Sequence, residues 1–171
     1  MRIAYIIPSL YRMAPNRVVQ QLVEGMMARG HECHVFYFDP VTTDAIAFPC
    51  RATRISLLRA TDLTGYDVVH THGLRPNLYV WIHGVPRGVR AVATIHSYVF
   101  EEFRFIYGRV LGWIFGHLFV RTLSRHDRVV TLSRDAVDHY AHWIRPSRLT
   151  YCYNGVEEPT VDVPPDADDC R

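Results

Sequence analysis

The architecture of this chain follows from its opening, residues 2–30, which read RIAYIIPSLYRMAPNRVVQQLVEGMMARG. Residues 2–7 form an unbroken apolar run, the pattern of a parallel strand that is covered on both faces. After a loop, apolar residues recur at helical spacing over 17–29, and Gly30 stands where a helix-ending glycine belongs. A further strand over 31–38 completes a β-α-β unit, which predicts a right-handed crossover in a parallel sheet.

The rest of the chain repeats this alternation of strand and helix. Expected strands lie at residues 51–55, 67–70, 91–95, 128–131 and 149–153, and expected helices at 77–83, 103–125 and 134–143. The pattern predicts the α/β class, with a single Rossmann-like, doubly wound parallel sheet over residues 1–156. Residues 157–171 are acidic and contain prolines, so we expect a tail or linker remnant there.

Composition narrows the class of protein. The chain has 171 residues, of which 49% are apolar and 21% charged, as in one globular domain with a substantial core. Its 19 basic residues, all arginine, nearly balance 17 acidic ones, which does not favour a nucleic-acid partner. Four cysteines without a C-x-x-C pair predict a reducing, cytoplasmic location. No apolar run reaches the roughly 18–20 residues of a transmembrane helix, and the opening run stops at Pro8, short of a signal peptide.

Histidines follow two of the expected strands, at the edge where ligands bind in such sheets. Residues 67–74 read DVVHTHGL, and residues 91–97 read AVATIHS. We favour His72 and His96 as site residues, whereas His70 has an equally good structural explanation, because a strand that ends there should turn its ring away from His72. The three histidines have no carboxylate or cysteine nearby in sequence to complete a zinc site, so we expect no metal.

Five segments, in order, resemble the N-terminal half of family 4 glycosyltransferases of GT-B architecture. They are residues 3–10 with 17–19 and 29–32, then 67–73, 93–96, 127–133 and 153–157, and the likeness covers about residues 2–157. The resemblance implies transfer of a sugar from a nucleotide-sugar donor to an acceptor hydroxyl, with retention of configuration and without a metal or other cofactor. In that family the reaction takes place in a cleft between two Rossmann-like domains, of which the N-terminal one mainly binds the acceptor.

The resemblance also implies roles for individual residues. The catalytic position is His96, which matches the histidine that reaches the reacting sugar. Acceptor-binding positions are His70, His72, Gly73, Arg75, Ser97 and Tyr98, and positions near the donor phosphates are Arg12, Asn16 and Arg17. The partners implied are a nucleotide sugar and a glycan, lipid-linked or small-molecule acceptor, in the synthesis of a cell-envelope or exocellular polysaccharide.

Two departures from the family pattern matter. The first loop, residues 10–17, reads LYRMAPNR and lacks the glycine pair that lets backbone amides approach phosphate, so Arg12 and Arg17 would supply charge instead. The segment 154–157, NGVE, resembles the junction between the two halves, and only fourteen residues follow it. We therefore expect an acceptor-side half that is inactive alone. It is either a truncated fragment or one subunit of a split enzyme whose donor-binding domain is a separate chain.

Three alternatives remain open. One is a non-catalytic Rossmann-like binding or scaffold domain. A dinucleotide-binding oxidoreductase is disfavoured, because no G-x-G-x-x-G follows the first strand. The third concerns Phe103–Arg125, where arginines alternate with bulky apolar residues. A helix that covers the sheet with exposed arginines is the favoured interpretation, and peripheral contact with the inner face of a membrane is the other.

Overall fold

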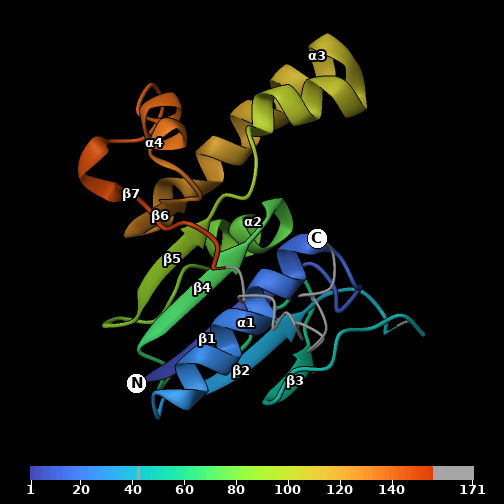
Figure 1. Cartoon of the computed structure of the whole chain (residues 1–171), viewed down its shortest axis with the longest axis vertical. Coiled ribbons are helices and arrows are strands. Elements are labelled where there is room, and N and C mark those ends of the chain that lie inside the picture. The colour runs from blue at the N-terminus through green and yellow to red at the C-terminus, as the bar shows by residue number, and fades with distance from the viewer. Residues whose placement is uncertain (42, 156–171) are drawn as a thin grey trace, which may run out of the picture.

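The computed structural model describes residues 1–41 and 43–155 of the chain. Within these residues, seven strands form one parallel sheet in the order β3-β2-β1-β4-β5-β6-β7 (Figure 1). The strands are β1 (Arg2–Ile7), β2 (Glu32–Tyr37), β3 (Arg51–Arg54), β4 (Val68–His72), β5 (Arg90–Thr94), β6 (Arg128–Thr131) and β7 (Leu149–Tyr151). The helices are α1 (Ala14–Ala28), α2 (Leu74–His83), α3 (Val99–Thr122) and α4 (Arg134–Tyr140), with short 3-10 helices η1 (Leu123–Arg125) and η2 (Pro146–Arg148).

This sheet confirms the predicted α/β, Rossmann-like class. Strand β1 lies at the centre with β2 on one side and β4 on the other, and all but the first of its residues are buried. The strand order reverses between β1 and β4, because the chain builds outward from β1 to β3 and then restarts at β4. Ligands of open parallel sheets bind beside such a reversal, at the carboxyl ends of the strands.

The helices cover the two faces of the sheet unequally. Helix α1 packs on the face that carries Tyr5, through Val19 and Val23, and Figure 1 shows it lying across β1 and β2. Helices α2, α3 and α4 pack on the opposite face, where Ala4 and Ala93 point. The face of β4, β5 and β6 that shares its side with Tyr5 therefore has only α1 beside it, among the helices described.

Several elements differ from their predicted bounds. Helices α1, α2 and α3 begin three or four residues earlier than expected, at Ala14, Leu74 and Val99. A proline stands within the first turn of α1 and of α2, where its missing N–H is not needed. Each helix therefore includes this proline, whereas the expected helix began after it. Strand β4 continues to His72, two residues beyond the expected end, and β7 ends at Tyr151. The expected tail, residues 157–171, lies outside the described residues, as does the predicted boundary at 156.

Helix α3 is bent into a hairpin, and this corrects the favoured expectation of one helix covering the sheet. Gly108, with φ of 78°, breaks the helix into two arms. A Cβ on Gly112 would lie 2.5 Å from the Cα of Arg104, and one on Gly116 would lie 2.4 Å from the ring of Phe100, so the arms run side by side. Figure 1 shows α3 projecting from the body of the molecule. None of the helices in the described part of the chain is both long enough and apolar enough to cross a membrane.

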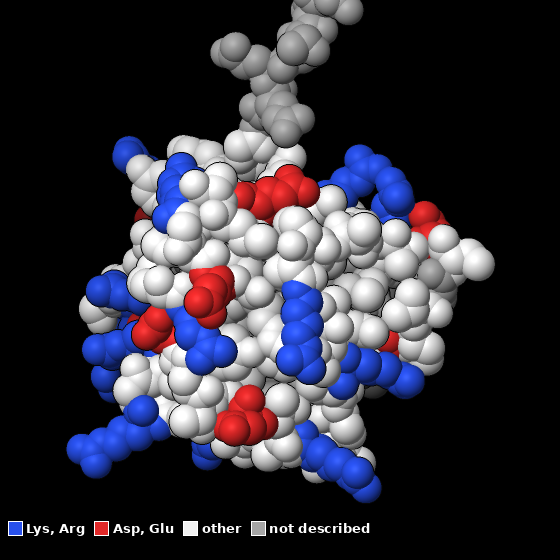
Figure 2. Space-filling view, turned by 90° about the horizontal axis from the view of Figure 1, so that it is seen from below, with Lys and Arg blue, Asp and Glu red and all other residues white. Residues whose placement is uncertain are grey.

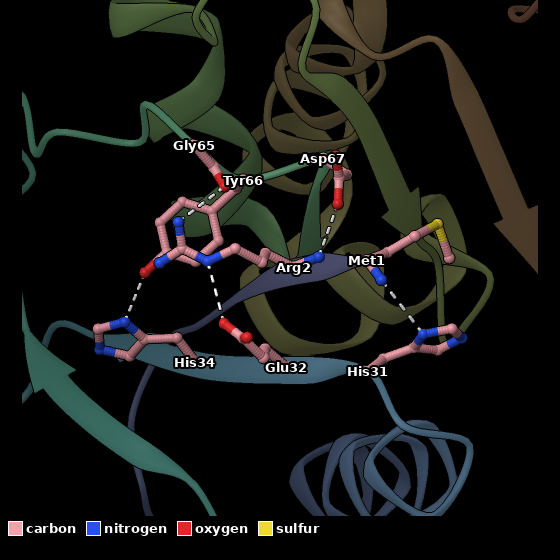
Figure 3. A network of polar contacts seen from close by, with 8 residues as sticks. All are labelled: Met1, Arg2, His31, Glu32, His34, Gly65, Tyr66 and Asp67. Carbon is pink, nitrogen blue, oxygen red and sulfur yellow. Dashed lines mark hydrogen bonds and ion pairs between the residues drawn. The ribbon is translucent and has the colours of Figure 1, made fainter.

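The amino-terminal edge of the sheet is closed by a polar network (Figure 3). Arg2 donates from Nε to Glu32 at 3.1 Å and from a terminal nitrogen to the carbonyl of Gly65 at 3.0 Å, while its amide bonds Asp67 at 2.7 Å. His34 bonds the hydroxyl of Tyr66 at 2.6 Å. On the side seen in Figure 2, arginine and carboxylate side chains are interspersed. The hydrogen bonds of Arg2 and His34 thus join strands and loops at the edge of the sheet opposite the one where ligands are expected.

Candidate functional site

The carboxyl ends of β4 and β5 bring two predicted site residues into direct contact. His72 is the last residue of β4, and His96 lies two residues beyond the end of β5. The Nδ1 atom of His72 and the Nε2 atom of His96 are 2.9 Å apart, a hydrogen bond between the two rings. His72 is buried, with 2% of its surface exposed, whereas His96 is half-buried. Of the two rings, His96 is therefore the one within reach of a ligand.

His70 lies on the same side of the sheet as His72, contrary to the expectation that its ring points away. Because β4 persists through both residues, alternation places them on one face, with ring centroids 4.3 Å apart. His70 bonds through Nε2 to the hydroxyl of Thr94 at 2.8 Å. His70 and Thr94 line a pocket of about 610 Å³, which lies between α1 and the segment that follows β7. The pocket is on the sheet face beside α1.

Burial keeps these rings uncharged at neutral pH. Loss of contact with water, reinforced by the neighbouring imidazoles, lowers the pKa of His70 to about 3 and holds the pKa of His72 well below its ordinary value. Burial alone lowers the pKa of His96. A cluster of neutral imidazoles can give and accept hydrogen bonds, and each ring has one donor and one acceptor nitrogen.

The placement of protons in this pair follows from the surroundings of His72. Its Nε2 atom is buried and has no hydrogen-bond partner among the described residues. A buried N–H without a partner is rarer and more costly than an unpaired acceptor, so we assign the proton of His72 to Nδ1, where it is donated to His96. His96 then accepts at Nε2 and carries its own proton on Nδ1, which can donate to a ligand.

The loop that carries His96 is fixed by a buried tyrosine from α4. The hydroxyl of Tyr140 donates to the carbonyl of Ser97 at 2.7 Å and accepts the amide of Val99 at 2.9 Å. Tyr140 is fully buried, and its pKa is raised by that burial. These two bonds hold both ends of the turn that leads from His96 into α3.

The other predicted acceptor-binding residues divide into two groups. Gly73, with φ of 96°, makes the turn from β4 into α2. A Cβ there would lie 3.4 Å from Pro8, so the end of β4 passes close to the first loop at this glycine. Ser97 and Tyr98 follow His96 in the chain, and their side chains contact the helices after it: Ser97 donates to Glu102 of α3, and the hydroxyl of Tyr98 lies 3.3 Å from Asp135 of α4. Arg75 instead reaches Asp39 at 2.5 Å, two residues beyond the end of β2.

The three residues predicted near donor phosphates have different surroundings. Asn16 is buried, and its side-chain amide donates to the carbonyls of Ser9 and Tyr11 at 2.9 and 2.7 Å, so it shapes the first loop. Arg12 is half-exposed and lies 3.2 Å from Asp44, a surface pair of small energy. Arg17 is exposed in the first turn of α1. The two arginines can therefore turn towards a ligand, whereas Asn16 is already engaged.

The amino end of α1 offers few free amides to an anion. The amides of Asn16 and Arg17 both bond the carbonyl of Met13, and Pro15 has no N–H. Any charge that the first loop supplies to a ligand must therefore come mainly from arginine side chains. Among the residues that the structure describes, no three His, Cys, Asp or Glu side chains are arranged to hold a metal ion.

Comparison with known proteins identifies the family. The sequence model of the family Glycosyltransferase Family 4 matches residues 15–158, which is most of the chain. The chain belongs to this family. An O-antigen biosynthesis glycosyltransferase of Escherichia coli, WclY, is 32% identical to this family 4 chain over 168 residues. The match covers 92% of the chain but 46% of WclY, so the chain spans about half the length of the curated relatives that it matches.

Solved structures of GT-B glycosyltransferases share the fold of this family 4 chain. Sucrose-phosphate synthase from Thermosynechococcus elongatus matches with a TM-score of 0.70 and 16% identity, over 91% of this chain and 49% of that one. An alpha-glucosyltransferase in complex with UDP-glucose and DNA containing an abasic site matches with a TM-score of 0.60 and 16% identity, over 90% of this chain and 42% of that one. In each case the family 4 chain corresponds to about half of the larger molecule.

Two residues of this family 4 site were missed from the sequence. Thr94 pairs with His70 across 24 residues, and Tyr140 reaches the His96 loop from 41 residues away along the chain. Alternation in the 91–95 strand could have placed Thr94 on one face, but not against His70. Helical spacing could have predicted that Tyr140 is buried, but nothing local indicates what its hydroxyl contacts.

Proposed function

We propose that this chain is the acceptor-side half of a glycosyltransferase that moves a sugar from a nucleotide-sugar donor to an acceptor hydroxyl with retention of configuration. The observation that carries the proposal is the bonded pair His72–His96 at the carboxyl ends of β4 and β5, beside the reversal of the strand order, in a chain that belongs to glycosyltransferase family 4. The donor-binding half lies outside residues 1–171. The reaction needs neither a metal nor another cofactor in this proposal.

His96 is the residue that we place against the reacting sugar. With Nε2 engaged by His72, its Nδ1–H donates a hydrogen bond to a sugar hydroxyl and helps to position the donor for transfer. Because the ring is neutral, it directs a dipole at the sugar without adding a positive charge to the site. The buried His72 acts through His96 and sets its orientation and its proton.

The remaining residues divide between acceptor and donor. His70, Gly73, Ser97 and Tyr98 form the acceptor side, with His70 at the wall of the 610 Å³ pocket. Arg75 is already paired with Asp39, so it would bind the acceptor only through a guanidinium N–H that this ion pair leaves free. Arg12 and Arg17 neutralise the developing diphosphate charge.

The names of the relatives support a proposal for the acceptor class and the location. The E. coli relatives are named for O-antigen biosynthesis. We therefore place this chain in the synthesis of a cell-envelope or exocellular polysaccharide, with a glycan or lipid-linked acceptor, in the cytoplasm or at the inner face of the membrane.

The test is a chimera in which residues 1–155 replace the matching half of WclY. We expect transfer from a nucleotide sugar, measured as glycosylated acceptor. His96→Ala should lower the rate about tenfold or more, since the hydrogen bond that positions the sugar is lost. His142→Ala is the matched control, because His142 is an exposed histidine outside the candidate site, and this change should leave the rate unchanged. Equal rates for the two variants would remove His96 from the site.

The chain alone distinguishes this proposal from a binding or scaffold domain. Residues 1–171 should bind an acceptor glycan but turn over no nucleotide sugar, because the groups that hold the donor lie in the other half. Isothermal titration with acceptor and with nucleotide sugar, each separately, measures this. A chain that binds neither and forms a stable homodimer would support the scaffold function.

A further inference from the structure

The far end of the α3 hairpin presents an exposed apolar surface. We define the hairpin tip as residues 104–114, on either side of the break at Gly108. Five of its aliphatic and aromatic side chains are more than half exposed: Phe105 at 91%, Val110 at 73%, Trp113 at 61%, Ile106 at 55% and Leu111 at 51%. Large apolar side chains gathered and exposed at the end of one element indicate a site of interaction with another molecule.

The base of the same hairpin is firmly packed. Phe119 and Leu123 are 4% and 1% exposed and belong to the core that α3 shares with α4 and the sheet. Gly112 brings the two arms into contact, because its missing Cβ leaves room for the backbone of Arg104. The tip is thus held out from the body by a built element, and its exposure is a property of the fold.

Charge on the hairpin is of one sign. Between Phe103 and His126 the sequence contains four arginines and no aspartate or glutamate. Arg104 and Arg109 stand within the tip and are exposed. The nearest carboxylates in sequence, Glu101 and Glu102, lie in the first turn of α3, at the end of the arm away from Gly108.

We propose that the hairpin tip docks on the surface of a lipid bilayer that contains anionic headgroups. Phe105, Val110 and Trp113 enter the interface, where an aromatic or aliphatic side chain gains free energy by leaving water, and the arginines bind headgroup phosphates. A second copy of the chain fits less well, because it would bring four tip arginines together with no tip carboxylate to pair them.

The docked arrangement has a consequence for the candidate site. Helix α3 begins at Val99, three residues after His96, and the loop between them is fixed by Tyr140. Docking through α3 therefore holds the carboxyl edge of the sheet at a fixed height above the bilayer. The proposal itself stands on the hairpin alone and does not require glycosyl transfer.

Co-sedimentation of residues 1–171 with vesicles tests the proposal. We expect binding to vesicles of phosphatidylcholine with phosphatidylglycerol at low salt, weaker binding at high salt, and little binding to pure phosphatidylcholine. Phe105→Ser and Val110→Ser should each lower the partition coefficient about tenfold. Arg104→Gln and Arg109→Gln should each lower it about fivefold, on the anionic vesicles only.

Controls separate the tip from exposed residues in general. Leu58, 85% exposed, and its exposed neighbour Arg59 lie far along the chain from α3, so Leu58→Ser with Arg59→Gln should leave vesicle binding unchanged. Trp113 fluorescence should be quenched by lipids with brominated acyl chains, in a variant in which the other two tryptophans are phenylalanine.

Several results would overturn docking on a bilayer. One is wild-type protein that stays in the supernatant with anionic vesicles, and another is a control variant that loses as much binding as Phe105→Ser. A third is a dimer in sedimentation velocity that Phe105→Ser converts to monomer, without vesicle binding, which would assign the tip to a second copy of the chain. Circular dichroism checks that each variant is folded, which we expect for changes at exposed positions.

Discussion

At the scale of single residues, the geometry of the candidate site depends on buried side chains that hold the His96 loop and ring in place. Tyr140 joins α4 to the loop after β5 through two bonds made by one hydroxyl group, to the carbonyl of Ser97 and the amide of Val99. His72 likewise fixes the His96 ring from beneath. Both are buried, so their polar atoms have no access to water as an alternative partner.

Tyr140→Phe should reveal this positioning role. The change leaves the carbonyl of Ser97 and the amide of Val99 without their partner, so we expect the free energy of unfolding in urea to fall by about 1–3 kcal/mol. The NMR signals of the His96 ring should also shift, while those of the exposed His142 stay in place. Tyr107→Phe, at a half-exposed tyrosine, is the control and should change stability by less than about 0.5 kcal/mol. An unmoved His96 signal would mean that the loop is fixed by other contacts.

At the scale of elements, the α3 hairpin shows how a glycine pair changes what a helix does. Gly112 and Gly116 lie one turn apart on the second arm and face Arg104 and Phe100 of the first. Side chains at these positions would hold the arms apart, whereas glycine lets the second arm touch the backbone of Arg104 and the ring of Phe100. The same segment without a break at Gly108 would be the long covering helix that its apolar residues predict.

Gly112→Ala should therefore destabilise the protein, in contrast to Gly25→Ala in α1. The new Cβ at Gly112 would lie 2.5 Å from the backbone of Arg104, which cannot move without separating the arms, and we expect a loss of roughly 1–3 kcal/mol. A Cβ at Gly25 meets only the flexible end of Arg29 at 3.3 Å, and alanine is the better helix former by up to about 1 kcal/mol. Urea unfolding of both variants measures the difference. Equal stability of Gly112→Ala and the wild-type chain would contradict close packing of the arms.

At the scale of the whole molecule, buried histidines link stability to pH. His70 and His126 have folded-state pKa values of about 3 and about 4, lowered mainly by burial, while the unfolded chain titrates near the ordinary 6.5. Between pH 6.5 and 4 the unfolded state therefore binds more protons than the folded state. These rings therefore cost no stability above pH 6.5, and the free energy of unfolding falls as the pH drops below that value.

Urea unfolding across this pH range tests the linkage. Each of these two rings should contribute a slope of up to about 1 kcal/mol per pH unit between pH 6 and 4. His126→Gln should remove one part of the slope, at the cost of the bond between His126 and Thr71, while His142→Gln, at an exposed histidine, should keep it. A wild-type curve that stays flat from pH 6.5 to 4 would show that the rings are not held neutral by the fold.

The alternation of strands and helices, the parallel sheet and the edge where ligands are expected are all determined by the sequence alone. These features depend on local periodicity and on the handedness of β-α-β units, so each short segment carries its own information. The positions of His72 and His96 at that edge follow from the same argument, and their mutual contact needs only that two neighbouring strands end together.

Only the tertiary structure decided how those residues are used. Whether His70 shared a face with His72 depended on where β4 ended, and its bond to Thr94 joins residues 24 apart. The contact of Tyr140 with the His96 loop spans 41 residues, and the outward projection of the α3 tip depends on two arms meeting at glycines. Such contacts arise from the packing of whole elements, and no local pattern of residues encodes which distant side chain will complete them.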